Sequence, residues 1–232
     1  MVCDTNRKSS ATFDALGRFR TRVLSASTDT YSYVGTGETV TRIANSGGTS
    51  TDSIVSPAGD RLGVKVGGTV NWFLPDPHGN IAASLDAAET TVVNALRYDA
   101  YGQTIATGSA GGSAVGQDTW KYQGRLDISP SGLGTPLYDM SARFYSPGIG
   151  AFTQLDSVMG GAQNPLSMNR FLYAHANPAT LIDPTGHCAM DMMLSCGAQS
   201  APAPAPSRPR TYDDGPAQSA NPSAAWTTTQ HS

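Results

Sequence analysis

The stretch YDAYGQ, residues 98–103, reads aromatic-Asp-Ala-x-Gly-polar, and FDALGR at 13–18 repeats this pattern without a gap. Weaker copies of the same turn are SPAGDR at 56–61 and DPHGN at 76–80. An Asp at such a position accepts a backbone N–H bond from two residues on, and the Gly then adopts the positive φ that closes the turn. The four segments therefore predict a series of similar turns, each joining two strands.

The spacing of these turns predicts a repeat architecture. Their glycines follow one another at separations of 42, 20 and 23 residues: Gly17, Gly59, Gly79 and Gly102. The period is thus about 21 residues, with one degenerate copy expected near 35–40. A unit of this length holds two short strands and two turns. One hairpin cannot bury its apolar face alone, so the units are expected to stack into one long antiparallel sheet.

The plainest hairpin lies at 62–74, LGVKVGGTVNWFL. Gly67-Gly68 supplies a two-residue turn of the kind that joins antiparallel strands. Apolar residues alternate with polar or small ones before and after it: Leu62, Val64, Val66, Val70, Trp72 and Leu74. We expect two paired strands here, with these alternating residues forming the apolar pattern.

The composition fits a β-rich chain and argues against several classes of protein. Acidic charge is almost all Asp, 16 against 2 Glu, and there are only 3 Lys, so the residues that usually cover helices are scarce. Gly and Pro together number 40, which indicates many turns. A net charge of −3 predicts no binding to nucleic acid. No apolar run reaches the roughly 20 residues that span a bilayer, so no membrane span is expected.

The cysteines and the N-terminal residues point to no further chemistry. Cys3, Cys188 and Cys196 are too few for a disulfide framework. Free thiols and a single Cys188–Cys196 bridge both remain open, with free thiols favoured. Their spacing matches no standard zinc pattern and no nucleotide motif is present, so we expect no metal and no cofactor. The first residues lack the apolar core of a signal peptide.

The chain divides into four segments by pattern. We assign residues 1–10 to an N-terminal lead-in, 11–118 to the repeats, 119–187 to a core domain and 188–232 to a variable tail. The repeat region ends in the loop at 105–118, which is rich in small residues.

Aromatic residues become dense after this loop and are expected to pack in a core that closes the repeat array. They are Trp120, Tyr122, Tyr138, Phe144, Tyr145, Phe152, Phe171 and Tyr173. The tail, rich in Pro and Ala, cannot bury enough apolar surface to offset its ordering entropy, so we expect it to be largely disordered. Residues 188–196 are compatible with one or two helical turns.

The core segment carries an ordered set of landmarks: LYDMSARFYSP at 137–147, GAF at 150–152, NRFLYAHANP at 169–178 and DPTG at 183–186. Together with the aromatic-Asp repeats, they resemble the Rhs/YD-repeat family, which includes Rhs proteins, Tc-toxin C components and the YD shell of teneurins. The stretch 122–187 resembles the Rhs repeat-associated core domain. The resemblance covers about residues 11–187.

The resemblance implies an all-β fold, in which an antiparallel sheet of YD repeats spirals into a partial shell closed by the core domain as a plug. In polymorphic toxins of this family the shell encloses a variable C-terminal cargo. Some members cut that cargo free just after the DPxG turn. Carried over by motif, the catalytic residues here are Arg143, Asp156 and Asp183, and the cut lies near His187-Cys188. The activity implied is a single-turnover aspartyl autoprotease without activity on other substrates.

Those residue types suit the reaction. Two carboxyl groups that share one proton can hydrolyse a peptide bond, because the ionised one activates a water while the protonated one polarises the carbonyl. Arg143 adds a fixed positive charge that can hold one carboxylate by a bidentate contact. Asp183 and its target share one tight turn, so a high effective molarity replaces a substrate-binding site.

Three positions depart from the family pattern: Ala151 stands where Arg is common, Ser157 where Pro is common, and His187 where Leu is common. Because His187 replaces the usual residue before the cut, the position of the cut stays open. The side chain is interpreted either as a plain turn residue, which we favour, or as a catalytic base. Asp183 is either a turn former or a catalytic residue. Asp156 is either catalytic or only the ion-pair partner of an arginine.

Three functions fit the sequence. The first is a shell and processing module whose partners are its own or adjacent shell repeats and the C-terminal cargo. The second is a recognition or adhesion module that binds carbohydrate or protein at the cell surface. The third is an inactive, truncated remnant. A secreted or cell-surface location, as part of a larger protein, is expected for the first two.

Overall fold

The computed structural model describes residues 9–24, 27–111, 116, 119–129, 134–160, 165–187 and 189–191. Within these ranges the chain is all-β, as predicted, and its only helical elements are three short 3-10 turns, η1 (Tyr122–Gly124), η2 (Pro165–Met168) and η3 (Ala174–Ala176). No helix in the described part of the chain is both long and apolar enough to cross a membrane. The lead-in 1–8 and the tail 192–232 lie outside the described residues.

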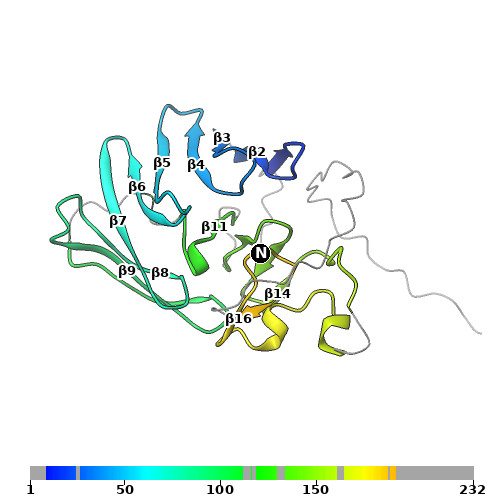
Figure 1. Ribbon diagram of the computed structural model, residues 1–232. Helices are drawn as coiled ribbons and strands as arrows, with labels where there is room; N and C mark the ends of the chain where they lie inside the picture. Colours follow the sequence, from blue (N-terminus) through cyan, green and yellow to red (C-terminus); the bar gives the residue numbers. More distant parts are fainter. Residues whose placement is uncertain are drawn as a thin grey trace, which may run out of the picture.

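The repeat region forms one ten-stranded antiparallel sheet in which every strand pairs with its neighbours in sequence. Its strands are β1 (Ser9–Phe13), β2 (Phe19–Leu24), β3 (Ser27–Tyr33), β4 (Val40–Asn45), β5 (Ser50–Val55), β6 (Arg61–Val66), β7 (Thr69–Pro75), β8 (Ile81–Leu85), β9 (Val92–Tyr98) and β10 (Thr104–Gly108). The sheet curves from β2 past β6 and β7 to β8 and β9, with β11 and β14 on its inner side (Figure 1). It is an open, curved sheet rather than a closed barrel.

The predicted turns share one hydrogen-bond frame. In the turn that begins at Asp14, the residue's N–H bonds to the carbonyl of Arg18, the N–H of Gly17 bonds back to Asp14, and Asp14 Oδ1 accepts the N–H groups of Leu16 and Arg18. Asp76 and Asp99 repeat the same frame. The carboxylate therefore fixes the backbone, as the repeat motif predicted.

The degenerate copy expected near 35–40 is present as a turn between β3 and β4. The N–H of Val34 bonds to the carbonyl of Thr39, and the N–H of Gly37 bonds back to Val34. No Asp stands at its start, so the backbone frame forms there without a carboxylate.

The hairpin at 62–74 is confirmed, but the residues of its second strand that point into the core are not the apolar ones at alternate positions. With a two-residue turn, Val64 pairs with Asn71 and Gly63 pairs with Trp72. Paired residues share a face, so the inward residues of β7 are Asn71 and Phe73, and Leu74 is exposed. The apolar residues at alternate positions before and after the turn thus point to opposite faces of the sheet.

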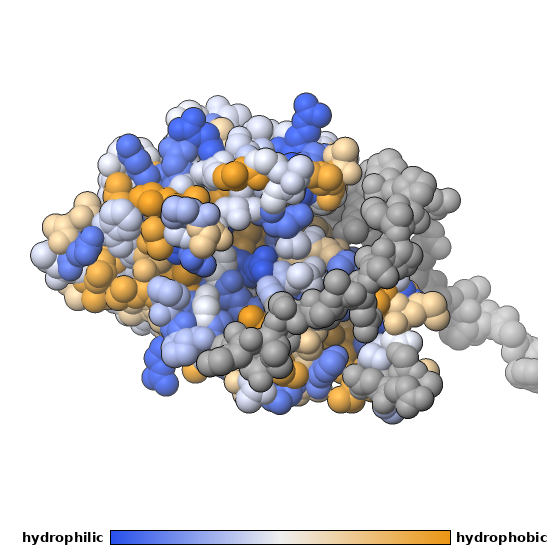
Figure 2. Space-filling model, in the orientation of Figure 1, coloured by the Kyte–Doolittle hydropathy of each residue, from blue (hydrophilic) through white to orange (hydrophobic). Residues whose placement is uncertain are grey.

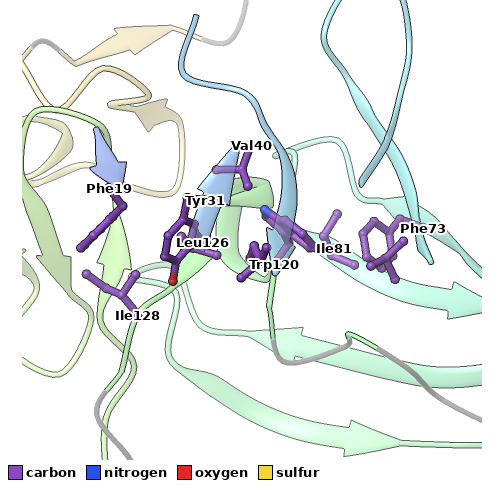
Figure 3. Packing of buried hydrophobic residues seen from close by; sticks show 10 residues of the cluster. Phe19, Tyr31, Val40, Phe73, Ile81, Trp120, Leu126 and Ile128 are labelled. Carbon is purple, nitrogen blue, oxygen red and sulfur yellow. The ribbon is translucent and has the colours of Figure 1, made fainter. Parts of the chain in front are cut away.

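The core domain adds short strands on the inner side of the sheet: β11 (Leu126–Asp127), β12 (Tyr138–Asp139), β13 (Phe144–Ser146) and β14 (Ala151–Phe152). They form a four-stranded antiparallel sheet of their own. Trp120, Leu126 and Ile128 pack against inward residues of the ten-stranded sheet such as Phe19 and Ile81 (Figure 3). The repeats bury their apolar face against the core domain.

A second cluster of the core domain is mostly tyrosine: Tyr122, Tyr138, Met140, Tyr145, Phe152, Tyr173 and Ala174 are all buried in it. The Tyr145 and Tyr173 ring centroids lie 4.0 Å apart. Hydroxyl groups reach backbone carbonyls of the last repeat turn, for example Tyr122 to Ala100 at 2.9 Å and Tyr145 to Tyr101 at 2.7 Å. Burial raises the pKa of Tyr122 to about 12, so the ring stays neutral. The cluster fastens the core domain to the repeats.

One aromatic prediction is wrong. Phe171 is 44% exposed rather than packed in the core, although its backbone carbonyl accepts the N–H of Phe152. Other large apolar side chains nearby, such as Ile149 and Met159, are also exposed. Figure 2 shows hydrophobic and hydrophilic residues interspersed over the visible face.

Strand pairing occurs again beyond residue 187. β15 (Leu181–Ile182) pairs with β16 (Met190–Asp191) in a two-stranded antiparallel sheet, so helical turns at 188–196 are wrong at least for these two residues. The segment between the two strands contains the DPTG turn. That turn is the centre of the candidate site.

Candidate functional site

The DPTG turn shares two of the hydrogen bonds that hold the repeat turns. Asp183 Oδ1 accepts the N–H of His187 at 3.0 Å, four residues on, and the N–H of Gly186 bonds back to the carbonyl of Asp183 at 3.4 Å. Gly186 has φ +70, and a Cβ there would lie 2.5 Å from the carbonyl oxygen of Met140. Only glycine fits this backbone at this close approach.

The carbonyl groups of the turn are held from outside it. Arg125 donates to the oxygen of Pro184, the N–H of Ala142 donates to Thr185 at 3.3 Å, and Arg143 Nε donates to Gly186. Ala142 and buried Arg143 thus hold the turn against the β12–β13 connection, and half-buried Arg125 holds it from the segment before β11.

Arg143 joins the two candidate aspartates. Its Nη2 lies 3.0 Å from Asp156 Oδ2 and 3.3 Å from Asp183 Oδ2. Because both oxygens contact one nitrogen, the distance between the two Oδ2 atoms cannot exceed the sum of these two N···O distances. All three residues are buried, with Asp183 only 2% exposed. Residues 27 positions apart in sequence thus meet at one guanidinium.

His187 belongs to the same group. Its Nδ1 lies 2.8 Å from Asp156 Oδ1, which also accepts the N–H of Val158 at 2.9 Å. The His187 side chain is 36% exposed, so the ring sits at the rim of the site. The family pattern places Leu at this position, and a Leu cannot form this contact.

The remaining hydrogen bonds of Arg143 keep it in place. Its Nη1 donates to the carbonyl of Arg170 at 2.8 Å, and its guanidinium carbon lies 3.6 Å from the centre of the Phe152 ring. Burial lowers the pKa of Arg143, while the carboxylates of Asp156 and Asp183 oppose that shift. An arginine remains charged under such conditions. The site therefore holds a fixed cation between two acidic side chains.

This arrangement differs from two carboxyl groups that share only a proton. Here a guanidinium nitrogen lies between the two Oδ2 atoms. Each carboxylate therefore contacts the same buried cation, and neither is left without an oppositely charged partner.

Comparison with known proteins gives relatives in sequence. No family model matches the chain. It is 33% identical over 110 residues to the tRNA nuclease WapA of Bacillus subtilis strain 168, a match that covers 47% of this chain and 4% of that protein. It is 28% identical over 130 residues to the tRNA3(Ser)-specific nuclease WapA of Bacillus spizizenii, covering 56% of this chain and 5% of that protein.

Solved structures give the same answer for the fold. A crystal structure of TcdB2-TccC3-Cdc42 superposes with a TM-score of 0.60 at 18% identity, over 81% of this chain and 9% of that one. A Photorhabdus luminescens Tc holotoxin pore with a TccC3 variant superposes with a TM-score of 0.58 at 15% identity, over 87% of this chain and 10% of that one. The chain is related to the Rhs/YD-repeat shell proteins. It spans at most a tenth of the Rhs/YD chains it matches.

Two residues of this candidate site were not singled out from the sequence. Arg125 holds the Pro184 carbonyl, and Arg170 donates to the backbone carbonyl of Asp156. Both lie inside stretches that carry the family resemblance, so their position was a usable signal. Cys188, on the far side of the expected cut, lies outside the described residues.

Proposed function

We propose that the chain is the C-terminal shell and core segment of an Rhs-type toxin, and that it cuts itself at the DPTG turn to release the variable segment behind it. Its partners are then neighbouring shell repeats and its own C-terminal segment. The catalytic residues proposed are Arg143, Asp156 and Asp183. We assign no nuclease activity to this chain, because the matches cover only 4% and 5% of the WapA relatives.

The observation that carries the proposal is the contact of one buried guanidinium with both aspartates and with the turn itself. A structural turn needs only the Asp183 frame, as the repeat turns demonstrate. The second aspartate, from a distant part of the sequence, adds nothing to that frame. Buried ionic groups are costly unless they are paired, so their assembly around one turn favours a chemical role.

The reaction fits the groups present. A carboxylate takes a proton from water, the guanidinium stabilises the negative charge that develops on the attacked carbonyl oxygen, and the proton left at the site passes to the departing nitrogen. The bond is part of the same folded chain, so its position is fixed before reaction and a single turnover suffices.

A purely structural role makes a different prediction, and expression of residues 1–232 with a tag at each end separates the two. Folded protein, verified by a cooperative unfolding transition, is expected to convert to two fragments whose masses sum to the intact chain plus one water. The variant Asp156→Asn is expected to remain intact.

The matched control is Asp127→Asn. The Asp127 carboxylate is half-buried in the core domain, also accepts an N–H two residues on, and pairs with Lys121 at 3.0 Å. It touches no residue of the DPTG turn in the described contacts. It should cleave like the wild type. Folded wild-type protein that stays intact, or an Asp156→Asn variant that is cut as fast as Asp127→Asn, contradicts the proposal.

A further inference from the structure

We propose that the Arg61 guanidinium binds one small oxyanion, a carboxylate or a phosphate group, between the ten-stranded sheet and the core domain. This site is separate from the DPTG turn and does not depend on the proposed self-cleavage. Its basis is a half-buried cation that lies on an aromatic ring, has no acidic partner among the described residues and keeps two of its nitrogens unpaired.

Arg61 follows a repeat turn that lacks the usual starting aspartate. The SPAGDR turn starts with Ser56, whose Oγ accepts the N–H of Asp60 and donates to Asp60 Oδ2, both at 3.0 Å. The acid of this turn is therefore exposed and bound within the turn. In the turn that begins at Asp14, by contrast, the carboxylate pairs with Arg18 at 2.7 Å. Arg61 thus enters β6 without the acidic partner that Arg18 has.

The Arg61 side chain is held by neutral groups. Its Nη1 donates to Ser53 Oγ at 2.5 Å and to the carbonyl of Val40 at 3.3 Å. Its guanidinium carbon lies 3.9 Å from the centre of the Trp120 ring. Trp120 is buried in the core cluster that joins the sheet to the core domain (Figure 3). These contacts fix the position of the cation, and none of them neutralises its charge.

The unpaired atoms of Arg61 lie on one edge of the guanidinium. Its Nε is enclosed and has no hydrogen-bond partner. Its Nη2 also has none among the described residues, and this nitrogen is not enclosed. Nε and Nη2 form the edge that binds a carboxylate or a phosphate through two parallel N–H···O bonds. The edge that suits an oxyanion is therefore the one that the described residues leave unused.

The charge near Arg61 is also positive. The charged side chain that acts on it is a second cation, Arg125, which precedes the residue bridged to Trp120. Burial and this cation lower the pKa of Arg61 to about 9, so the side chain stays protonated at neutral pH. Three carboxylates act on Arg125 and not on Arg61, those of Glu38, Asp139 and Asp183. A charge taken out of water is costly unless it is paired, so a bound anion would supply the missing partner.

The test is the thermal unfolding midpoint of the full chain during a titration with sodium phosphate, with sodium chloride at equal ionic strength as the reference. An anion that binds the folded state raises this midpoint until the site is saturated. We expect such a rise for the wild type with phosphate and not with chloride. The variant Arg61→Met keeps an unbranched side chain against Trp120 but carries no charge, and it is expected to lose the rise.

Two further variants control for a general effect of charge. Arg97→Met removes an exposed arginine of β9 and should respond to phosphate as the wild type does. Arg61→Lys keeps the charge without the two-nitrogen edge, and we expect it to bind phosphate about tenfold more weakly. Because Arg61→Lys retains the cation on Trp120, it tests the site independently of the stability of Arg61→Met.

A variant of one acidic residue identifies the source of the oxyanion. Asp118 stands two residues before Trp120 in the sequence and lies outside the described residues. A site filled from solution gives the same phosphate response in the wild type and in Asp118→Asn. A site filled by the Asp118 carboxylate gives a response in Asp118→Asn alone. Both results support an oxyanion at Arg61 and differ in where it comes from.

Other results overturn the site. No phosphate response in the wild type and none in Asp118→Asn would mean that Arg61 binds no such anion. A rise in Arg61→Met or Arg61→Lys equal to that of the wild type would mean that phosphate binds elsewhere. None of these measurements involves cleavage of the chain, so their outcome leaves the proposed function untouched.

Discussion

The turns of the repeats and the DPTG turn of the core domain share a carboxylate bond to the backbone four residues on and differ in what surrounds it. In both, an aspartate Oδ1 accepts the N–H of the residue four positions on, as in Asp76 with Asn80 and Asp183 with His187. In the repeat the second oxygen stays local, since Asp76 Oδ2 binds the side chain of Asn80 at 2.7 Å. At Asp183 the second oxygen contacts Arg143, 40 positions away.

The difference distinguishes a turn held only by its own residues from a turn that also contacts distant segments. In the Asp76 turn both carboxylate oxygens bind residues of the turn itself, so neither oxygen binds a distant residue in this way. In the DPTG turn the residue four positions on, His187, turns its ring to Asp156 instead. One oxygen of Asp183 is thereby available to the buried guanidinium, and the turn is tied to two distant segments.

The largest effect should come from removing the cation. Arg143→Met leaves two buried carboxylates without their partner and is expected to cost about 3–5 kcal/mol of unfolding free energy. Arg18→Met, which removes the corresponding partner of Asp14 in a repeat, should cost clearly less because that pair keeps contact with water, with side chains 11% and 25% exposed. Urea unfolding of both variants measures the contrast. Equal losses would break the distinction between the two kinds of turn.

A smaller effect is expected at the turn glycines. Gly17 and Gly186 both have positive φ, so alanine at either position costs roughly 1–2 kcal/mol from backbone strain. At Gly17 the added Cβ meets no atom within 4 Å, whereas at Gly186 it meets the Met140 carbonyl. Gly186→Ala is therefore expected to be the more destabilising of the two. Thermal unfolding compares them, and a Gly17→Ala variant at least as unstable as Gly186→Ala would contradict the packing described.

The smallest effect concerns acid. Backbone N–H bonds from Thr90 and Thr91 hold the pKa of Asp86, in another repeat turn, below its ordinary value of 3.8. A depressed pKa in the folded state means that this contribution to stability is fully present above pH 3.8 and is lost as pH falls through the lower folded value.

The stability difference between the wild type and Asp86→Asn should accordingly be constant near neutral pH and shrink below pH 3.8. Unfolding midpoints measured in urea across the acid range test this. A difference that grows as the pH falls would reverse the sign and contradict the hydrogen bonds assigned to Asp86.

Much of this architecture could be predicted from sequence because it is set by local chemistry. Asp14, Asp76 and Asp99 fix their own turns with neighbouring N–H groups, so the motif alone carries the geometry. The facing of Trp72 could not be inferred from alternation, because it depends on the register across a two-residue turn.

The site was predictable only in part. Arg143, Asp156 and Asp183 were named through a family resemblance, and their meeting depends on long-range packing that no local pattern encodes. Arg125 supports the turn from a distant segment, and its one signal in the sequence is that it lies within the stretch that carries the family resemblance. The exposure of Phe171 likewise depends on tertiary packing, which the density of aromatic residues in the sequence does not reveal.

The central claim is that Asp183 does more than Asp99 does in the same frame. The most direct measurement is the intact mass, over time, of two purified and folded full-length variants, Asp183→Asn and Asp99→Asn. We predict that Asp99→Asn separates into the two fragments of the wild type, and that Asp183→Asn stays whole. Cleavage of Asp183→Asn at the rate of Asp99→Asn would contradict the account.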